Sequence, residues 1–230
     1  MDIETMHQNV KVELDKSSAL ELPAFETEEI DYWINKAIRE FVKTRYDGLN
    51  IHSTGFEQTQ KRIDDLRTLV EYDVLSAGSG VDGLGHGRYG DTTWSFDLPA
   101  DYWFTLAEEV RLDVDGDNYR VGVVQCTHDE YIQKFEDPFS EHILHYGTAK
   151  PLRLFYNDSV EFVTDGNYDV DRYYLTYLKV PETVEYGAGT DCDLPEHTHD
   201  EIVNMAANMM LENIEQPRYQ THSAEVATME

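Results

Sequence analysis

The sequence predicts an α+β fold: a helical bundle, built from an N-terminal helical hairpin and a C-terminal helix, with an inserted antiparallel β-sheet or small barrel domain. Near both ends of the chain, apolar residues recur every three or four positions, as on one face of an amphipathic helix. Between them, short runs rich in aromatic and β-branched residues alternate with turn residues, as in antiparallel strands. With 230 residues, 40% of them hydrophobic, the chain can bury a substantial core.

The helical hairpin is predicted over residues 25–76. Its first helix extends from Glu26 to Tyr46 and carries its apolar residues on one face, and Gly48 supplies a C-terminal stop signal. A second helix is predicted from Phe56 to Leu75. The short link between them indicates that the two helices pack antiparallel.

Residues 77–91 are rich in glycine and contain the pattern Gly78-x-Gly80-x-x-Gly83-x-Gly85. A dinucleotide-binding fingerprint requires such glycines between a strand and a following helix, so that the pyrophosphate lies at the helix N-terminus. This segment instead follows a predicted helix and precedes a predicted strand, and it lacks the Gly-Lys-Ser/Thr ending of a P-loop. We therefore interpret it as a flexible linker between the helical and β parts.

A β domain with one short helix is predicted over residues 92–194. The segment THDEYIQKF begins that helix with a capping box formed by Thr127 and Glu130, and Pro138 ends it. The segment DVDGDN resembles a calcium loop at first sight, but Val124 stands where the twelfth position requires a bidentate Glu. We interpret it as the turn of a β-hairpin.

The C-terminal helix is predicted over residues 195–216 and is expected to pack back on the hairpin. Thr198 and Glu201 are spaced as a second capping box, and Pro217 marks the end of the helix. Its apolar stripe includes several methionines, which at helical spacing is typical of core packing. Residues 217–230 form a C-terminal tail.

The chain carries 46 acidic and 18 basic side chains, a formal net charge of −28. This excess disfavours unassisted binding to nucleic acid or anionic lipid, and so argues against a direct DNA reader. No run approaches the roughly twenty apolar residues of a membrane span, and the N-terminal segment lacks the apolar centre of a secretory signal. We expect a soluble protein made inside the cell, with Cys126 and Cys192 as thiols, although two cysteines are compatible with a single bridge.

Basic residues concentrate between positions 36 and 67, where the local charge is +2 and leaves −30 on the rest of the chain. One interpretation is a solvated helical surface with ordinary ion pairs one turn apart. The other is a basic surface that meets an acidic surface on a neighbouring copy. The residues predicted to contact such a partner are Arg39, Lys43, Arg45, Arg62 and Arg67.

Nothing in the sequence singles out a catalytic site. It contains neither a glycine-flanked serine elbow nor a cysteine in a recognisable catalytic setting, and paired carboxylates are uninformative among so many acids. We expect a protein that is not an enzyme and binds no cofactor. The alternative is a small metal-binding module or metalloenzyme using Cys192, His197 and His199, although no fourth ligand pair stands at finger-like spacing and the histidines flank a helix N-cap.

Seven segments follow one another along the chain as LELPAFETEEIDYWINKAIREFVKTRYDG, FEQTQKRIDDLRTLV, LPADYW, THDEYIQKFEDPF, PLRLFY, YYLTYLKVP and LPEHTHDEIVNMAANMMLENIEQPRYQ. This series resembles the ring or head-to-tail adaptor proteins in the neck of crAss-like podoviruses, tailed phages that infect gut Bacteroidales. The resemblance covers roughly residues 10–220. Because the segments are collinear, the series is more specific than any one motif.

The resemblance implies a virion protein, made in the host cytoplasm, that forms a ring, a dodecamer, beneath the portal. Its expected partners are itself, the portal protein and neighbouring neck or tail rings, with no membrane. The ring would join the portal to the tail and form part of the DNA ejection conduit, through which the genome passes without specific binding. A conduit lined with carboxylates repels DNA phosphates, which gives the acidic composition a role.

The resemblance also implies termini that reach onto neighbouring rings. The candidates are residues 1–24, expected as an extended N-terminal arm, and the tail over residues 217–230, in which Arg218 and Tyr219 are the expected contacts. The alternative is ordinary terminal disorder.

Overall fold

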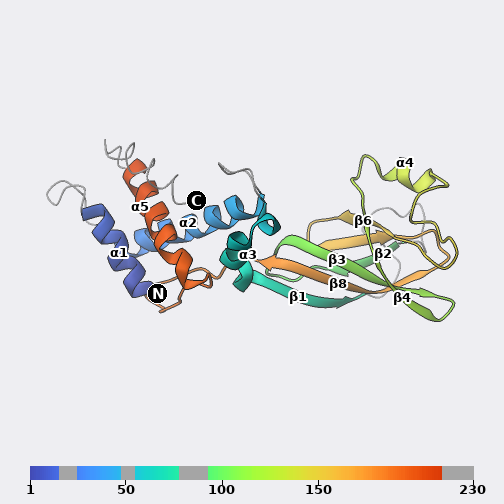
Figure 1. Ribbon diagram of the computed structural model, residues 1–230, viewed down its shortest axis with the longest axis horizontal. Coiled ribbons are helices and arrows are strands. Elements are labelled where there is room, and N and C mark those ends of the chain that lie inside the picture. Colours follow the sequence, from blue (N-terminus) through green and yellow to red (C-terminus); the bar gives the residue numbers. More distant parts are fainter. Residues whose placement is uncertain (16–24, 48–54, 78–92, 214–230) are drawn as a thin grey trace. The chain divides into compact units, whose positions relative to one another are not determined.

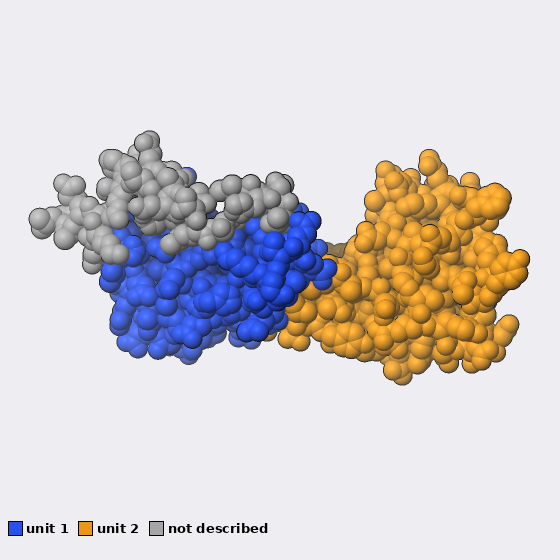
Figure 2. Space-filling model, in the orientation of Figure 1, with its two compact units in different colours: residues 1–69, 181–230 blue, residues 70–180 orange. Residues whose placement is uncertain are grey.

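The computed structural model describes residues 1–15, 25–47, 55–77 and 93–213 (Figure 1). These residues form an α+β protein, as predicted, in two compact units (Figure 2). Unit 1 comprises residues 1–69 and 181–230, and unit 2 comprises residues 70–180, so that unit 2 is an insertion in unit 1. Among the described residues, no helix is both long and apolar enough to cross a membrane.

Unit 1 is helical. Its elements are α1 (Ile3–Asp15), α2 (Thr27–Asp47), η1 (Phe56–Gln58), α3 (Gln60–Leu66), η2 (Arg67–Leu69), η4 (Glu196–Thr198) and α5 (His199–Asn213). The prediction of a helix over Glu26 to Tyr46 is confirmed by α2, whose buried face includes Ile34, Phe41 and Val42. As predicted, the C-terminal helix packs back on the N-terminal part, where α5 contacts both α1 and α2.

The N-terminal arm differs from the prediction, because α1 occupies most of what was expected as extended chain. Its buried residues Ile3, Met6, Val10 and Leu14 recur at three- and four-residue spacing. Each buried aliphatic or thioether side chain contributes about 1.5–3 kcal/mol, which stabilises a helix that would be marginal alone. Asp2 begins the helix, since its Oδ1 accepts the N–H of Thr5 at 2.9 Å.

The second predicted helix is wrong in its C-terminal half. Helix α3 ends at Leu66, one 3-10 turn follows, and Val70–Ser76 form strand β1. Val70 and Val74 fit a helical spacing of four, but the same stretch also alternates polar and apolar residues, and its antiparallel pairing with β8 decides the outcome. The β unit therefore begins at residue 70 and ends at residue 180, where residues 92–194 were expected. All but the first position of the predicted linker over residues 77–91 lies outside the described residues.

Unit 2 contains two four-stranded sheets. Sheet A has the order β1-β8-β3-β4 and is antiparallel throughout, whereas sheet B has the order β2-β7-β6-β5 with a short parallel pair at β5. The strands of sheet A are β1, β8 (Asp169–Lys179), β3 (Tyr102–Val114) and β4 (Asp117–Gly122). Those of sheet B are β2 (Thr93–Asp97), β7 (Ser159–Val163), β6 (Leu152–Phe155) and β5 (Val124–Gln125). Of the two predicted alternatives, the barrel is wrong, because the described strands form two separate sheets.

The main core of unit 2 lies between the two sheets. Phe96 and Phe162 of sheet B meet Tyr173 of sheet A, with ring centroids 4.9–5.9 Å apart in edge-to-face arrangements. Val110 and Leu112 of β3 are fully buried in the same core. Such aromatic packing adds about 0.5–1.5 kcal/mol per pair to the burial of the rings and fixes how the two sheets face each other.

The two predicted capping boxes are wrong in detail, although both helices exist. The short helix, α4, extends over Tyr131–Glu136, and its N-cap Glu130 makes no side-chain capping bond. At the C-terminal helix, Thr198 Oγ1 donates to the carbonyl of Pro195 at 2.8 Å, while Glu201 pairs with an arginine instead of its own helix end. The spacing of Thr and Glu in the sequence located the start of both helices within a few residues. Tertiary contacts decided which groups these Thr and Glu side chains contact.

The DVDGDN segment forms the predicted hairpin turn between β3 and β4. Asp115 and Gly116 both have positive φ, 53° and 94°, as in a two-residue turn whose twist matches the flanking strands. The carboxylate of Asp113 accepts the N–H of Gly116 at 2.8 Å, which closes the turn. The acidic side chains of this segment therefore shape the backbone.

Candidate functional site

The predicted partner-binding arginines and lysine fall into two groups in unit 1. Arg39, Lys43 and Arg67 are exposed, whereas Arg45 and Arg62 retain only 2% and 5% of their exposure. The fold thus removes Arg45 and Arg62 from the surface on which they were predicted to meet a partner. The other two predicted contacts, in the C-terminal tail, lie outside the described residues.

Arg45 is the centre of a buried ionic cluster that links α2, α3 and α5. Its Nε lies 3.1 Å from Asp65 Oδ2, its Nη2 lies 2.5 Å from Glu201 Oε1, and its guanidinium stacks on Phe41. His197 Nε2 reaches the second oxygen of Asp65 at 2.9 Å. Burial raises the pKa of Glu201, and the positive charge of Arg45 opposes that rise. The cluster holds three helices of unit 1 together, which is a structural role.

Arg62 satisfies the C-terminal end of α2. Its Nη1 donates to the carbonyl oxygens of Thr44 and Arg45, at 3.2 and 3.3 Å. The last carbonyls of a helix lack partners within the helix and carry partial negative charge, so a buried guanidinium is a favourable cap. Like Arg45, Arg62 is therefore explained by the packing of unit 1.

The alternative metal site is not formed by the residues proposed for it. His199 Nε2 bonds to the carbonyl of Leu194 at 2.8 Å, whereas His197 bonds to Asp65. Burial raises the pKa of the Cys192 thiol to about 11, so that this sulfur is protonated near neutral pH, unlike a metal-bound thiolate. Within the described parts of the chain, no group of three His, Cys, Asp or Glu side chains converges as metal ligands.

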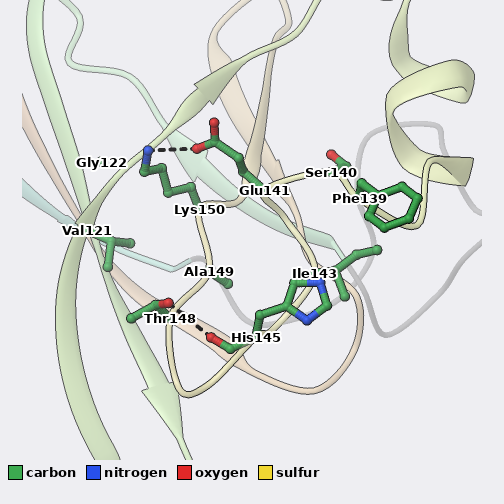
Figure 3. A pocket seen from close by; sticks show the side chains of 10 residues that line it. All are labelled: Val121, Gly122, Phe139, Ser140, Glu141, Ile143, His145, Thr148, Ala149 and Lys150. Carbon is green, nitrogen blue, oxygen red and sulfur yellow. Dashed lines mark hydrogen bonds and ion pairs between the residues drawn. The ribbon is translucent and has the colours of Figure 1, made fainter.

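Unit 2 carries a surface pocket of about 480 Å³ beside β4 (Figure 3). It is lined by Val121 and Gly122 of β4 and by residues of the 139–150 segment. Lys150 Nζ and Glu141 Oε2 form an ion pair of 2.7 Å at its edge, and both side chains are more than half exposed. An open pocket with apolar residues and one solvated ion pair suits weak packing against a partner better than a reaction.

The same segment displays aromatic side chains to solvent. Phe139 is 90% exposed and Tyr146 is fully exposed. Tyr146 and Gly147 form a tight turn with φ of 52° and 78°, although a bulky residue at positive φ is strained. Among the described residues of unit 2, no packing contact accounts for an aromatic residue at this position, and exposed aromatic residues are frequent at interfaces.

A second buried ion pair spans the two sheets of unit 2. Arg153 of β6 pairs with Glu108 of β3, whose other oxygen accepts the hydroxyl of Tyr173 at 3.0 Å. Both charged side chains are less than a tenth exposed. Burial raises the pKa of Glu108, and the charge of Arg153 counteracts it. This pair, like the Arg45 cluster, joins elements far apart in the sequence and holds the fold together.

Similarity to known proteins identifies the family of this chain. A family model described as phage tail ring protein 3/4 matches residues 1–221. The chain belongs to this family of crAss-like phage ring proteins. The match covers nearly all of this chain, with residues of both units, and it confirms the resemblance seen in the sequence. No curated protein matches the sequence significantly.

Membership gives this tail ring protein a structural role as a component of the virion. Among the candidate interface surfaces, sequence reasoning missed the edge of sheet A that β1 forms. Strand β1, with Tyr72 and Val74 exposed at the edge of sheet A, was predicted as helix. Its alternation of the acids Glu71 and Asp73 with those two apolar residues was the signal that could have revealed the strand.

Proposed function

We propose that this tail ring protein forms a dodecameric ring beneath the portal, joins the portal to the tail, and lines part of the channel through which the genome leaves. The observation that carries the proposal is the family match over residues 1–221. The match includes residues of both the helical unit and the inserted β unit.

The net charge of −28 supports the role in the channel. DNA carries a phosphate charge on each strand about every 3.4 Å, and a wall rich in carboxylates does not bind those phosphates. Lysines and arginines on the wall would each release counterions and retain the DNA. An acidic ring therefore lets the genome slide past without being held.

Copies with so much like charge need specific attractive contacts in order to assemble. The exposed members of the predicted basic set, Arg39 and Lys43 on α2 and Arg67 in η2, are the proposed contacts with acidic surfaces of a neighbouring copy. Lys43 Nζ lies 3.5 Å from Glu40 Oε1, and both side chains are about half exposed. Such an exposed ion pair contributes little to the stability of the fold, so Lys43 is available to a partner. Arg218 and Tyr219 of the tail are the proposed contacts with the portal or the next ring.

The experiment that tests this proposal is a symmetric reconstruction of the neck from intact particles. We expect density for this chain as a closed ring next to the portal, with carboxylates predominating on the axial surface. A ring that lies elsewhere in the tail, or one whose axial surface is basic, contradicts the proposal. Counting the copies in the same map tests the twelve-fold symmetry.

A further inference from the structure

Sheet A ends in two edges, β1 on one side and β4 on the other (Figure 1). Among the described residues, no further strand pairs with either edge. Strand β1 is seven residues long and pairs with β8 in a continuous register without a bulge. Its sequence, VEYDVLS, contains neither proline nor lysine, and Tyr72 and Val74 are 54% and 36% exposed. Long, flat edges that expose apolar residues readily add another strand, and proteins usually block them.

The backbone of β1 has hydrogen-bonding groups directed away from the sheet. Ala77, just after the strand, donates its N–H to the carbonyl of Asp171 in β8. Because bonded and non-bonded positions alternate in an antiparallel pair, Tyr72 and Val74 direct their peptide groups outward. The N–H of Val74 is occupied only locally, by the side chain of the preceding Asp73 at 2.7 Å. An incoming strand can therefore replace one short side-chain contact with a ladder of bonds.

The charges on the two edges favour pairing of β1 with β4 over pairing of β1 with a second β1. If β1 paired with a second β1, antiparallel registers centred on Tyr72 or Asp73 would set acids opposite acids, because Glu71 and Asp73 share a face. Strand β4 instead carries Arg120, whose guanidinium lies 4.1 Å from the ring of Tyr174 on the outer face. Pairing of β1 with β4 avoids this repulsion between two copies of β1.

The direction of the strands also suits a ring. Sheet A has an even number of antiparallel strands, so β1 and β4 run in opposite directions. If copies join edge to edge in the same orientation, β4 of one copy meets β1 of the next antiparallel, and the alternation continues. Such a head-to-tail contact uses two different surfaces, which is what a closed cyclic assembly requires.

We propose that β4 of each copy pairs with β1 of the next, so that sheet A continues from copy to copy around the ring. This inference rests on the proposed ring assembly and names the surface that closes it. The partner is a second copy of this chain, bound by strand addition.

Cysteine cross-linking tests the pairing on assembled protein. Val74 lies opposite Tyr174, and Asn118 lies opposite Asp113, on the outer face of the sheet, whereas Tyr119 lies opposite the buried Leu112. Val74→Cys with Asn118→Cys, in a chain whose native cysteines are serine, should form disulfides between copies on oxidation. The matched control, Val74→Cys with Tyr119→Cys, places the thiols on opposite faces and should not. A disulfide within one copy is excluded, because three strand spacings, about 14 Å, separate β1 from β4.

The register between copies is tested by repeating the experiment with Arg120→Cys, the next outer-face position of β4. At least one outer-face pair should give a ladder of covalent oligomers, with at least ten times the yield of the control. Rings that assemble but give no ladder from either pair overturn this inference and leave the proposed ring intact. A chain that forms no ring, alone or with the portal, contradicts the proposed function and this inference with it.

A second test removes an outward backbone N–H of β1, and it does not depend on the distance between two introduced thiols. Val74→Pro deletes an outward N–H, which an edge strand tolerates, while Val74→Thr keeps the N–H and a β-branched side chain. We expect the proline variant to keep the melting temperature of the monomer within a few degrees and to lose ring assembly at least ten-fold. The threonine variant should assemble normally. Equal assembly by both variants contradicts the pairing.

Discussion

Arg45 illustrates at the scale of one residue how burial redirects a charge. In sequence it is one of several bases on an amphipathic helix, yet in the fold it contacts Asp65 and Glu201 and is almost fully buried. Two carboxylates surround one guanidinium, so the removal of Arg45 deprives both of a buried cation in direct contact. A buried ion pair costs much to desolvate, but to break one by removing a single partner costs more.

We predict that Arg45→Met lowers the free energy of unfolding of unit 1 by about 3–5 kcal/mol. The matched control is Lys43→Met, which removes an exposed charge from the same helix and should change it by less than about 0.5 kcal/mol. Urea unfolding at neutral pH measures both. If the two variants unfold at the same urea concentration, the ionic cluster does not stabilise the helices as we describe.

At the scale of elements, β1 shows why the local sequence pattern was insufficient to distinguish a helix from a strand. Val70 and Val74 are spaced for a helix, and the residues between them also alternate for a strand, so the stretch supports two interpretations. Pairing with β8, a strand far along the chain, stabilises the second. In contrast, α2 was located almost to the residue, because its period is unambiguous over many residues.

The pair of Glu108 and Arg153 provides a prediction about how the two sheets are joined. Arg153→Met alone should destabilise unit 2 by about 3–5 kcal/mol, because it leaves the Glu108 carboxylate buried without a cation. Adding Glu108→Gln removes that charge and keeps an acceptor for the hydroxyl of Tyr173. We expect the double variant to recover at least half of the loss in urea unfolding. Strictly additive losses would show that the two side chains do not interact.

At the scale of the whole molecule, long-range repulsion competes with local attraction. Each copy carries −28, so a ring concentrates a large negative charge, whereas the attractive bases occupy a small part of unit 1. Salt screens repulsion between distant charges more than it weakens close contacts, since the Debye length falls from about 10 Å at 0.1 M to about 3 Å at 1 M.

Ring assembly should therefore strengthen with salt. We predict that the assembled fraction, measured by light scattering, rises roughly ten-fold between about 0.05 and 0.5 M NaCl. Lys43→Glu should assemble less than the parent, by a margin that narrows as salt increases, whereas Lys11→Glu on the exposed side of α1 gives the control for net charge. If the two variants assemble equally at low salt, Lys43 does not contribute to the interface.

The candidate surfaces were predicted only in part, for a physical reason. Sequence shows that bases gather between residues 36 and 67, but whether each reaches solvent depends on acids supplied by α3 and α5. The open edge of sheet A was not predicted, because an edge is defined by which strands are neighbours. The exposed Tyr146 likewise becomes noticeable only once its turn places it at positive φ.

The sequence by itself determined the class of fold, the insertion of a β part before the C-terminal helix, the acidic character and the resemblance to phage ring proteins. These follow from local periodicity, composition and collinear segments, which require no knowledge of contacts. Tertiary structure alone decided that α1 is a helix, that residues 70–76 are a strand, that the strands form two sheets instead of a barrel, and that two of the predicted arginines are buried. The reason is that burial and strand pairing depend on partners distant in the chain, and the free energy of those contacts exceeds local preference.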